Sequence, residues 1–438
     1  MGTGVVSALL HLFPYNNGCL ALKVMGLIFF LLNLVLFVFV CTCTVLRYYW
    51  FPEVCCRFYH FLVPALMSAR SGPSCWHTQH KVCLLDVSQW VLRRSSMPAW
   101  WVYSALPFVC FLTLSFQNVH SDWSSGGTAS DGFLWALWGF WWLDSAVSYI
   151  IAFGMIYAMM VRQDHALSKM TAVWLLPVVT LIVASSTGGL LSNVIREKSH
   201  TLAILTAGFS FTMVIIGLSF AMMIITTYLI RLITAGPPDA GLILSAFIVL
   251  GPLGQGGFSL LINGQDLSEL LPLHIGDEFP DLALAGQMIF AGCFLGAYIL
   301  WSMGFAWILL ALISISHVAR TNKLGFSMAY WGLIFPNGTF ALLSVQLSKV
   351  LDSPFFRAFG AAWSCVVFSL WVAIFIRSIP SFIDGSMFKA PYVIDGPAIP
   401  TFDIEREAKQ QSSSTLNQVP QVTQAQLEMD KMAEDRPL

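Results

Sequence analysis

Long apolar runs alternate with short polar segments along most of this chain. Since about 20 apolar residues cross a bilayer as a helix, the runs predict ten spans, near residues 1–13, 22–46, 99–118, 132–161, 170–191, 201–233, 241–263, 282–317, 325–351 and 355–378. The first run is too short to cross, and we interpret it as the second half of a helix that begins upstream. The pattern predicts an all-α, polytopic membrane protein.

Prolines follow an alternation of their own. Four of the odd-numbered runs contain Pro107, Pro177, Pro252 and Pro336, whereas the even-numbered runs contain none. A proline lacks the backbone N–H and clashes with the preceding turn, so it kinks the helix that it interrupts. We infer a helical hairpin repeated five times, with kinked inner helices around an axis and straight outer helices facing lipid. The alternative is that proline is simply commoner in membrane helices.

The run from 325 to 351 contains the most informative proline, because Phe335 stands directly before Pro336. In lipid, the backbone groups freed by a break are tolerated only where they face protein or a water-filled cavity. We therefore predict that Phe335 and Pro336 form the gate of a pore, with Phe335 as a hydrophobic constriction. The alternative for Phe335 is an aromatic side chain packed in the core.

Polar residues at membrane depth are the next candidates, since they are expensive there and usually functional. Gln255 lies in a glycine-rich segment that allows close backbone approach, which makes it the best candidate for touching a solute; tight helix packing is the alternative. Asp144 is a candidate proton relay or a hydrogen-bonded structural acid. The predicted lining of the path comprises Pro177, Ser185, Ser186, Thr187, Gly188, Gly251, Pro252, Gly254, Gln255, Gly256 and Asn337.

Composition narrows the function. The chain is 57% hydrophobic and 10% charged, which no soluble domain of this size shows, and its net charge of -1 gives no basic excess for nucleic acid. No nucleophile elbow, phosphate loop or zinc-protease motif is present, so we predict no enzyme, cofactor or metal site. Between their ends the predicted inner spans contain no Lys, Arg, Asp or Glu. Hydroxyls, amides and broken helix ends would pass anions through weak dipole contacts.

The segments outside the spans are assigned by charge and polarity. Lys and Arg are more numerous at span ends on the side of the C-terminus, which predicts that this side is cytoplasmic. Residues 1–378 form the predicted transporter domain, and the polar residues 379–438 form a disordered cytoplasmic tail. Residues 53–98 form an atypical cytoplasmic loop. Its Cys75, His77, His80 and Cys83 are metal-type ligands, but their spacing fits no familiar zinc site.

Several motifs together resemble one transporter family. They are Met1-Gly-Thr-Gly-Val-Val-Ser7, Leu10-His-Leu-Phe-Pro14, Val173-Trp-Leu-Leu-Pro177, Ser185 to Gly189, Gly251 to Gly257 and Trp331 to Pro336. The chain resembles the tellurite-resistance/dicarboxylate transporter family, also called the voltage-dependent anion channel family. The resemblance implies ten helices as five hairpins around a central pore, a phenylalanine that occludes this pore at the position of Phe335, and a homotrimer.

The family includes fungal sulfite efflux pumps and malate permeases, and the segment Gly251-Pro-Leu-Gly-Gln255-Gly-Gly257 is more similar to the sulfite branch. The resemblance therefore implies a multi-pass plasma-membrane protein that moves sulfite outward, with a small inorganic or carboxylate anion and the lipid bilayer as its partners. One alternative is the transport of C4-dicarboxylates such as malate. Another is a truncated member that does not transport, because residues 53–98 do not match the short loop of the family.

Overall fold

A computed structural model describes residues 2–15, 19–50, 129–162, 167, 170–238, 243–275, 282–321, 326 and 328–383 of the chain. These residues form helices and no strand, as predicted. The predicted span 99–118, the loop 53–98 and residues 384–438 of the predicted tail lie outside the described residues. The chain divides into a compact unit, Met1–Ile376, and a second, Arg377–Leu438, of which only the end of the last helix is described.

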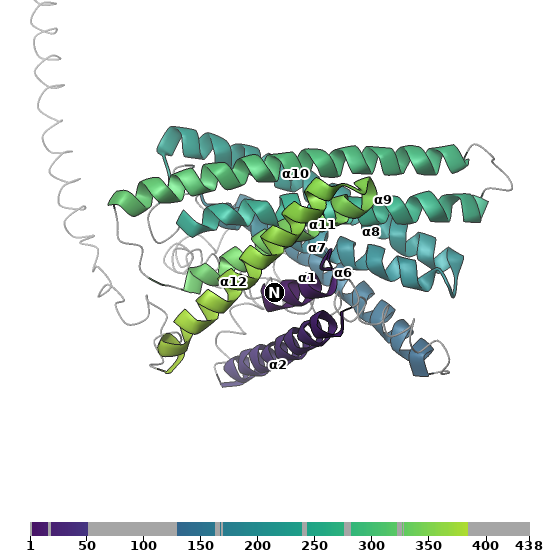
Figure 1. Cartoon of the computed structure of the whole chain (residues 1–438), viewed down its shortest axis with the longest axis horizontal. Helices are drawn as coiled ribbons and strands as arrows, with labels where there is room; N and C mark the ends of the chain where they lie inside the picture. Colours follow the sequence, from purple (N-terminus) through teal and green to yellow (C-terminus); the bar gives the residue numbers. More distant parts are fainter. Residues whose placement is uncertain are drawn as a thin grey trace, which may run out of the picture. The chain divides into compact units, whose positions relative to one another are not determined.

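The helices follow the predicted runs closely. In chain order they are α1 (Gly2–His11), α2 (Leu20–Trp50), α6 (Ala129–Arg162), η2 (Ala172–Leu175), α7 (Leu176–Ile195), α8 (His200–Ala235), η3 (Ile243–Val249), α9 (Leu250–Ile275), α10 (Leu282–Thr321), η4 (Met328–Leu333), α11 (Ile334–Leu351) and α12 (Pro354–Ile383), where η marks a 3-10 helix (Figure 1). Within the described residues, six helices are long and apolar enough to cross a membrane. The chain is therefore a multi-pass membrane protein.

Burial divides these helices into two classes. The most apolar segments of α7 and α9 are 78% and 83% buried, whereas those of α6, α8, α10 and α12 are only 29% to 33% buried. Most of the short helix α11 is buried as well. The exposed positions of the second class carry large apolar side chains such as Phe140, Met223 and Ile313, which suits contact with lipid chains. In the described part of the chain, α7, α9 and α11 are thus inner helices and α6, α8, α10 and α12 are outer ones. The short helix α1 is mostly buried too.

Helix α9 lies at the centre of the packing. It contacts α7, α8, α10 and α11, while α1 contacts α2 and α11, and α6 contacts α7 (Figure 1). Trp371 of α12 joins this group, because its Nε1 donates a hydrogen bond of 3.2 Å to Thr3 Oγ1 and its ring centroid lies 4.8 Å from that of Phe29. The middle of the unit therefore joins helices that come from distant parts of the sequence.

The described inner prolines stand in the first turn of an α-helix and not in its middle. Each described inner helix begins as a 3-10 helix, and the α-helix that continues it carries Pro177 at its second residue, or Pro252 or Pro336 at its third. In the first turn of an α-helix a backbone N–H has no intrahelical α-type acceptor, so a proline there breaks no such bond. The repeated feature of α7, α9 and α11 is a junction between two helix types.

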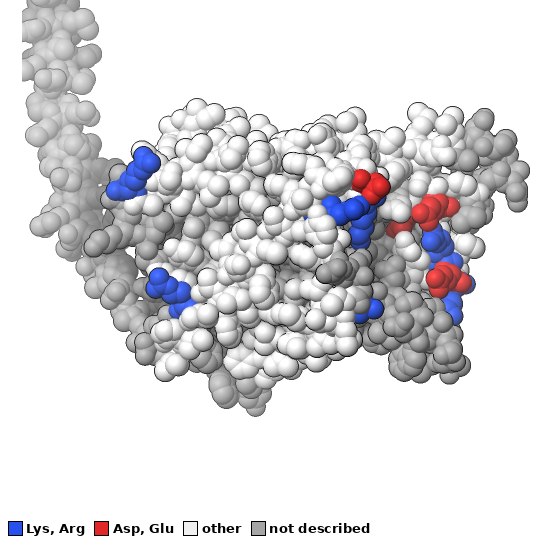
Figure 2. Space-filling model, in the orientation of Figure 1, with Lys and Arg blue, Asp and Glu red and all other residues white. Residues whose placement is uncertain are grey.

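Charged side chains are few on the described surface. On the face drawn in Figure 2 the described surface is largely uncharged, and its charged side chains gather in a few small groups. Two ion pairs join charged residues at helix ends, Arg196 with Glu269 and Arg357 with Asp352. The uncharged surface fits the interior of a bilayer, where a fixed charge is costly.

Candidate functional site

A continuous row of polar residues joins α7 to α9. On α9, Gln255, Ser259, Asn263 and Asp266 follow one another at steps of four, four and three residues, the spacing that places side chains on one face of a helix. All four are buried. We call the two facing rows the polar seam, which comprises Ser185, Ser186, Asn193 and Arg196 of α7 and Gln255, Ser259, Asn263, Asp266 and Glu269 of α9.

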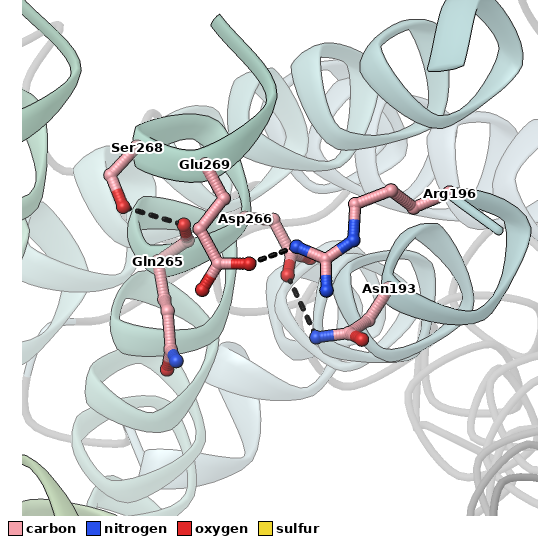
Figure 3. A network of polar contacts seen from close by, with 6 residues as sticks. All are labelled: Asn193, Arg196, Gln265, Asp266, Ser268 and Glu269. Carbon is pink, nitrogen blue, oxygen red and sulfur yellow. Dashed lines mark hydrogen bonds and ion pairs between the residues drawn. The ribbon is translucent and has the colours of Figure 1, made fainter. Parts of the chain in front are cut away.

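Hydrogen bonds cross the seam at successive levels. Gln255 Nε2 donates to Ser186 Oγ at 2.6 Å, and the hydroxyl oxygens of Ser185 and Ser259 lie 2.8 Å apart. Further along both helices, Asn193 Nδ2 donates to Asp266 Oδ1 at 3.4 Å, and Arg196 pairs with Glu269 (Figure 3). From the Ser185–Ser259 pair to the Arg196–Glu269 pair the residue numbers rise together on both helices, so α7 and α9 run parallel. The seam extends to the C-terminal end of α7.

Ser185 is the branching point of the seam. Its Oγ donates to the carbonyl oxygen of Ser210 on α8 at 2.6 Å. A hydroxyl has a single proton, so Ser185 must accept from Ser259 and from Asn263 Nδ2, which lies 3.2 Å away. Asn263 Oδ1 and Ser210 Oγ are buried and have no partner within the described residues. Such groups at membrane depth are places where a polar solute or water gains hydrogen bonds.

Most of the predicted lining residues of α7 have contacts inside the protein. The hydroxyls of Ser186 and Thr187 both donate back to the carbonyl oxygen of Val183, a common arrangement for such residues inside helices. A β-carbon added to Gly188 would overlap Ser210 Oγ and approach the indole ring of Trp141. Gly188 therefore allows α7 to lie close to α6 and α8, and it would do so with or without a solute.

Two glycines of α9 have the same packing role. A β-carbon on Gly254 would lie 2.6 Å from the backbone nitrogen of Phe340 on α11, and one on Gly256 would overlap the side chain of Leu218 on α8. Gly251 differs from them, because its β-carbon would meet only the ring of Phe335, at 4.0 Å. The structure thus brings Gly251 and the half-buried Phe335 together from two inner helices.

The remaining predicted residues lie at the start of α11 and on α6. Pro336 and Asn337 are buried, and Asn337 Nδ2 donates to the carbonyl oxygen of Leu333 at 2.8 Å. Asp144 is buried on the outer helix α6, and its Oδ2 has no partner within the described residues, nor do the hydroxyls of Ser145 and Ser148. Among the described residues, neither Asn337 nor Asp144 forms a hydrogen bond to the seam, so each is a separate polar position.

The sequence interpretation missed Ser259, Asn263 and Asp266. The predicted seventh span ended at residue 263, whereas α9 continues to Ile275, so the expectation of inner spans without acidic residues is wrong for this helix. The helical spacing of polar residues from Gln255 to Asp266 was the signal that could have found them. Among the described residues, no three His, Cys, Asp or Glu side chains lie close enough to hold a metal ion.

Comparisons with known proteins agree with the predicted family. The family model described as voltage-dependent anion channel matches residues 1–379. The sulfite efflux pump SSU1 of Arthroderma benhamiae is 28% identical over 89% of this chain and 90% of its own, and the pump of Candida albicans is 24% identical over 79% and 64%. The malic acid transport protein of Schizosaccharomyces pombe is 19% identical over 87% and 76%. The chain belongs to the voltage-dependent anion channel family.

Proposed function

We propose that this protein exports sulfite across the plasma membrane. The observation that carries the proposal is the similarity to fungal sulfite efflux pumps, which extends over 89% of the chain at 28% identity. The residues of α7 and α9 support it, because neither Leu176–Ile195 nor Leu250–Ile275 contains Lys or Arg. A path with no fixed positive charge holds an anion weakly, and weak binding lets the ion leave as readily as it enters. We propose no enzymatic activity.

The proposed path runs along the inner helices α7, α9 and α11. Its narrow point is the space beside Gly251, where Phe335 stands as a hydrophobic constriction. Pro177, Pro252 and Pro336 begin the α-helices that surround it, and the hydroxyls and amides of the seam offer dipoles to a passing anion. Gln255 is buried and its Nε2 donates to Ser186. In this proposal the side chain of Gln255 gives up that hydrogen bond when it donates to the anion.

We further propose the architecture that the family resemblance implies. Residues 1–378 would form ten transmembrane helices arranged as five hairpins around the path, and residues 379–438 a cytoplasmic tail. Three such domains would form a homotrimer. Since α8 to α12 cross the membrane in alternating directions, a cytoplasmic C-terminus places the C-terminal ends of α7 and α9 on the outer side of the plasma membrane.

A second candidate function is the transport of C4-dicarboxylates. It is favoured by the similarity to the malic acid transport protein of Schizosaccharomyces pombe, which extends over 87% of the chain at a lower identity of 19%. Malate is larger than sulfite and carries two carboxylates, so its passage beside Phe335 would require a wider opening. The two substrates can be separated in one experiment.

The test expresses the full chain in a fungal strain that lacks its own sulfite pump. Sulfite tolerance and sulfite release are measured, with malate uptake on the same cells and the amount of protein at the plasma membrane as a reference. Restored release without malate flux is the expected result. Malate flux without sulfite release would favour the second function, and the absence of both with normal surface expression would contradict both proposals.

A matched variant calibrates this experiment. Ser219 is exposed on the outer helix α8, and its hydroxyl donates only to the carbonyl oxygen of Ile215 in the same helix. Ser219→Ala changes a residue away from the inner helices, and we expect it to release sulfite as the unchanged protein does. It therefore shows whether an alanine substitution as such alters expression or targeting.

A further inference from the structure

The outer end of the polar seam holds a small charged cluster that the path described above does not use. We call Asn193, Arg196, Asp266 and Glu269 the seam-end cluster (Figure 3). Asn193 and Arg196 come from the last turn and the C-cap of α7, and the two acids come from α9, three residues apart. The cluster thus stands where the buried seam reaches the C-terminal end of α7.

Arg196 connects the surface to the interior in this cluster. Its guanidinium pairs with Glu269, which lies three residues after the buried Asp266 on α9. The side chains of Arg196 and Glu269 are 28% and 42% exposed, whereas Asp266 is 2% exposed. A solute arriving from outside therefore meets the Arg196–Glu269 pair first and Asp266 behind it.

Asp266 has an incomplete set of hydrogen bonds. Its Oδ1 accepts the 3.4 Å bond from Asn193, but its Oδ2 is buried and has no partner within the described residues. A buried carboxylate oxygen without a donor is unfavourable. Among the described residues Arg196 pairs with Glu269 and Asn193 donates to Oδ1, and neither gives a hydrogen bond to Oδ2, so this oxygen can accept one from a ligand.

We propose that the seam-end cluster is a binding site for oxyanions that still carry one O–H group. The ligand's charged oxygens would take the guanidinium of Arg196 in place of Glu269, since this planar fork suits oxyanions. Its O–H would donate to Asp266 Oδ2. Hydrogensulfite has both features. For the identity of the natural ligand the proposal rests on the proposed function, and it adds that the protein recognises the protonated anion.

The same geometry rejects a fully deprotonated dianion. Sulfate is a tetrahedral oxyanion like dihydrogen phosphate, but it carries two negative charges and has no proton to donate in neutral solution. Its oxygens would face the oxygens of the Asp266 carboxylate. Both groups accept hydrogen bonds and both are negatively charged, so binding is disfavoured. Asp266 would thus be a specificity-determining residue and Arg196 the residue that supplies most of the affinity.

The test measures binding to the purified full chain in lipid nanodiscs, with dihydrogen phosphate and hydrogensulfite as proton-bearing probes and sulfate as the control anion at equal ionic strength. Thermal stability is followed as a function of anion concentration. We expect stabilisation by the two probes and none by sulfate. Arg196→Gln should weaken binding of the probes by about 10-fold or more, the usual effect of losing a charged hydrogen-bond donor.

Two further variants separate recognition from folding. Asp266→Asn replaces an acceptor by a donor, so sulfate should now bind about as well as the probes. Glu269→Gln leaves Asp266 in place and frees Arg196, so the probes should bind more tightly with sulfate still rejected. Arg357→Gln removes the exposed pair with Asp352 and should change nothing. If the unchanged protein binds sulfate and the probes equally, or if Glu269→Gln leaves the affinity unaltered, the inference is wrong.

Binding and export are read separately, so the two proposals can fail independently. Selective binding in nanodiscs together with no sulfite release from cells would keep the site and reject the export function. Sulfite release together with unselective binding would reject the site and keep the function.

Discussion

A β-carbon on Gly251 would lie 4.0 Å from the ring of Phe335. Among the described residues, it would meet no other group within 4 Å from outside its own stretch of helix. Phe335 belongs to α11 and Gly251 to α9. At Gly254 the same two helices lie much closer, because a β-carbon there would be 2.6 Å from the backbone nitrogen of Phe340. The helices therefore touch at Gly254 and separate at Gly251, and the ring of Phe335 faces that separation.

Phe335→Ala should raise anion conductance, since it removes the ring that we propose as a hydrophobic constriction. We expect an increase of about tenfold, which corresponds to a barrier lower by about 1.4 kcal/mol. Currents from the protein in planar bilayers measure it directly. The control is Phe340→Ala, because Phe340 is fully buried against Trp301. This control should lose stability without a gain in current, and unchanged currents for Phe335→Ala would return Phe335 to the packing interpretation.

Gly251→Ala should impair sulfite transport but not folding, whereas Gly254→Ala should impair folding. Gly251→Ala introduces only an ordinary van der Waals contact with Phe335, so the protein should fold normally and carry less sulfite. Gly254→Ala places a β-carbon 2.6 Å from the backbone nitrogen of Phe340, so it should force α9 and α11 apart and lower the melting temperature and the amount of protein at the membrane. Thermal stability in detergent and sulfite release per molecule separate the two outcomes. Equal folding defects in both variants would contradict this view of Gly251.

The sequence allowed the helices to be predicted well, because their apolar runs are long and clearly bounded. The positions of the prolines also separated inner from outer helices, since Pro177, Pro252 and Pro336 all fall at the start of buried α-helices. Their position at the start of the α-helix was not predicted. A proline in an apolar run indicates a point where the regular α-helical hydrogen bonding is interrupted on its N-terminal side. Only the structure shows that a 3-10 helix occupies that side.

The candidate site was less predictable than the fold. Gln255, Ser185 and Ser186 were found because they lie beside glycines, but the partners of the seam lie about 70 residues away in the sequence, as the 69-residue separation of Ser186 and Gln255 shows. Which residue of α7 faces which residue of α9 depends on how the two helices are rotated and shifted, and that is decided by contacts such as Gly189 against Ile262. A single helix contains no information about this pairing.

Ser185→Ala should destabilise the protein more than most serine substitutions. It removes the hydroxyl that joins Ser210, Ser259 and Asn263, and it leaves buried polar groups without a partner. We expect a loss of about 1–3 kcal/mol in the free energy of unfolding, the usual cost of an unsatisfied buried group. Thermal unfolding in nanodiscs, compared with Ser219→Ala on the lipid-facing side of α8, gives the measurement. Equal stability of the two variants would mean that the seam is solvated and contributes little to folding.

Asp144→Asn tests whether anion flux is coupled to protons. Asp144 is buried on α6 and its Oδ2 has no partner within the described residues, so this oxygen can bind and release a proton without losing a hydrogen bond to them. If it is the relay, the amide variant should reach the membrane and still carry sulfite, but with a flux that no longer depends on pH. Flux into vesicles, measured over a series of pH values on each side, gives the comparison.

The control for this prediction is Ser148→Ala, one helical turn further along α6. Ser148 is also buried, and its hydroxyl has no hydrogen-bond partner within the described residues. Its substitution therefore disturbs the same region without removing a titratable group. It should keep the pH dependence of the unchanged protein. A pH profile that survives Asp144→Asn would make Asp144 a structural acid, because a group that cannot ionise would then suffice at that position.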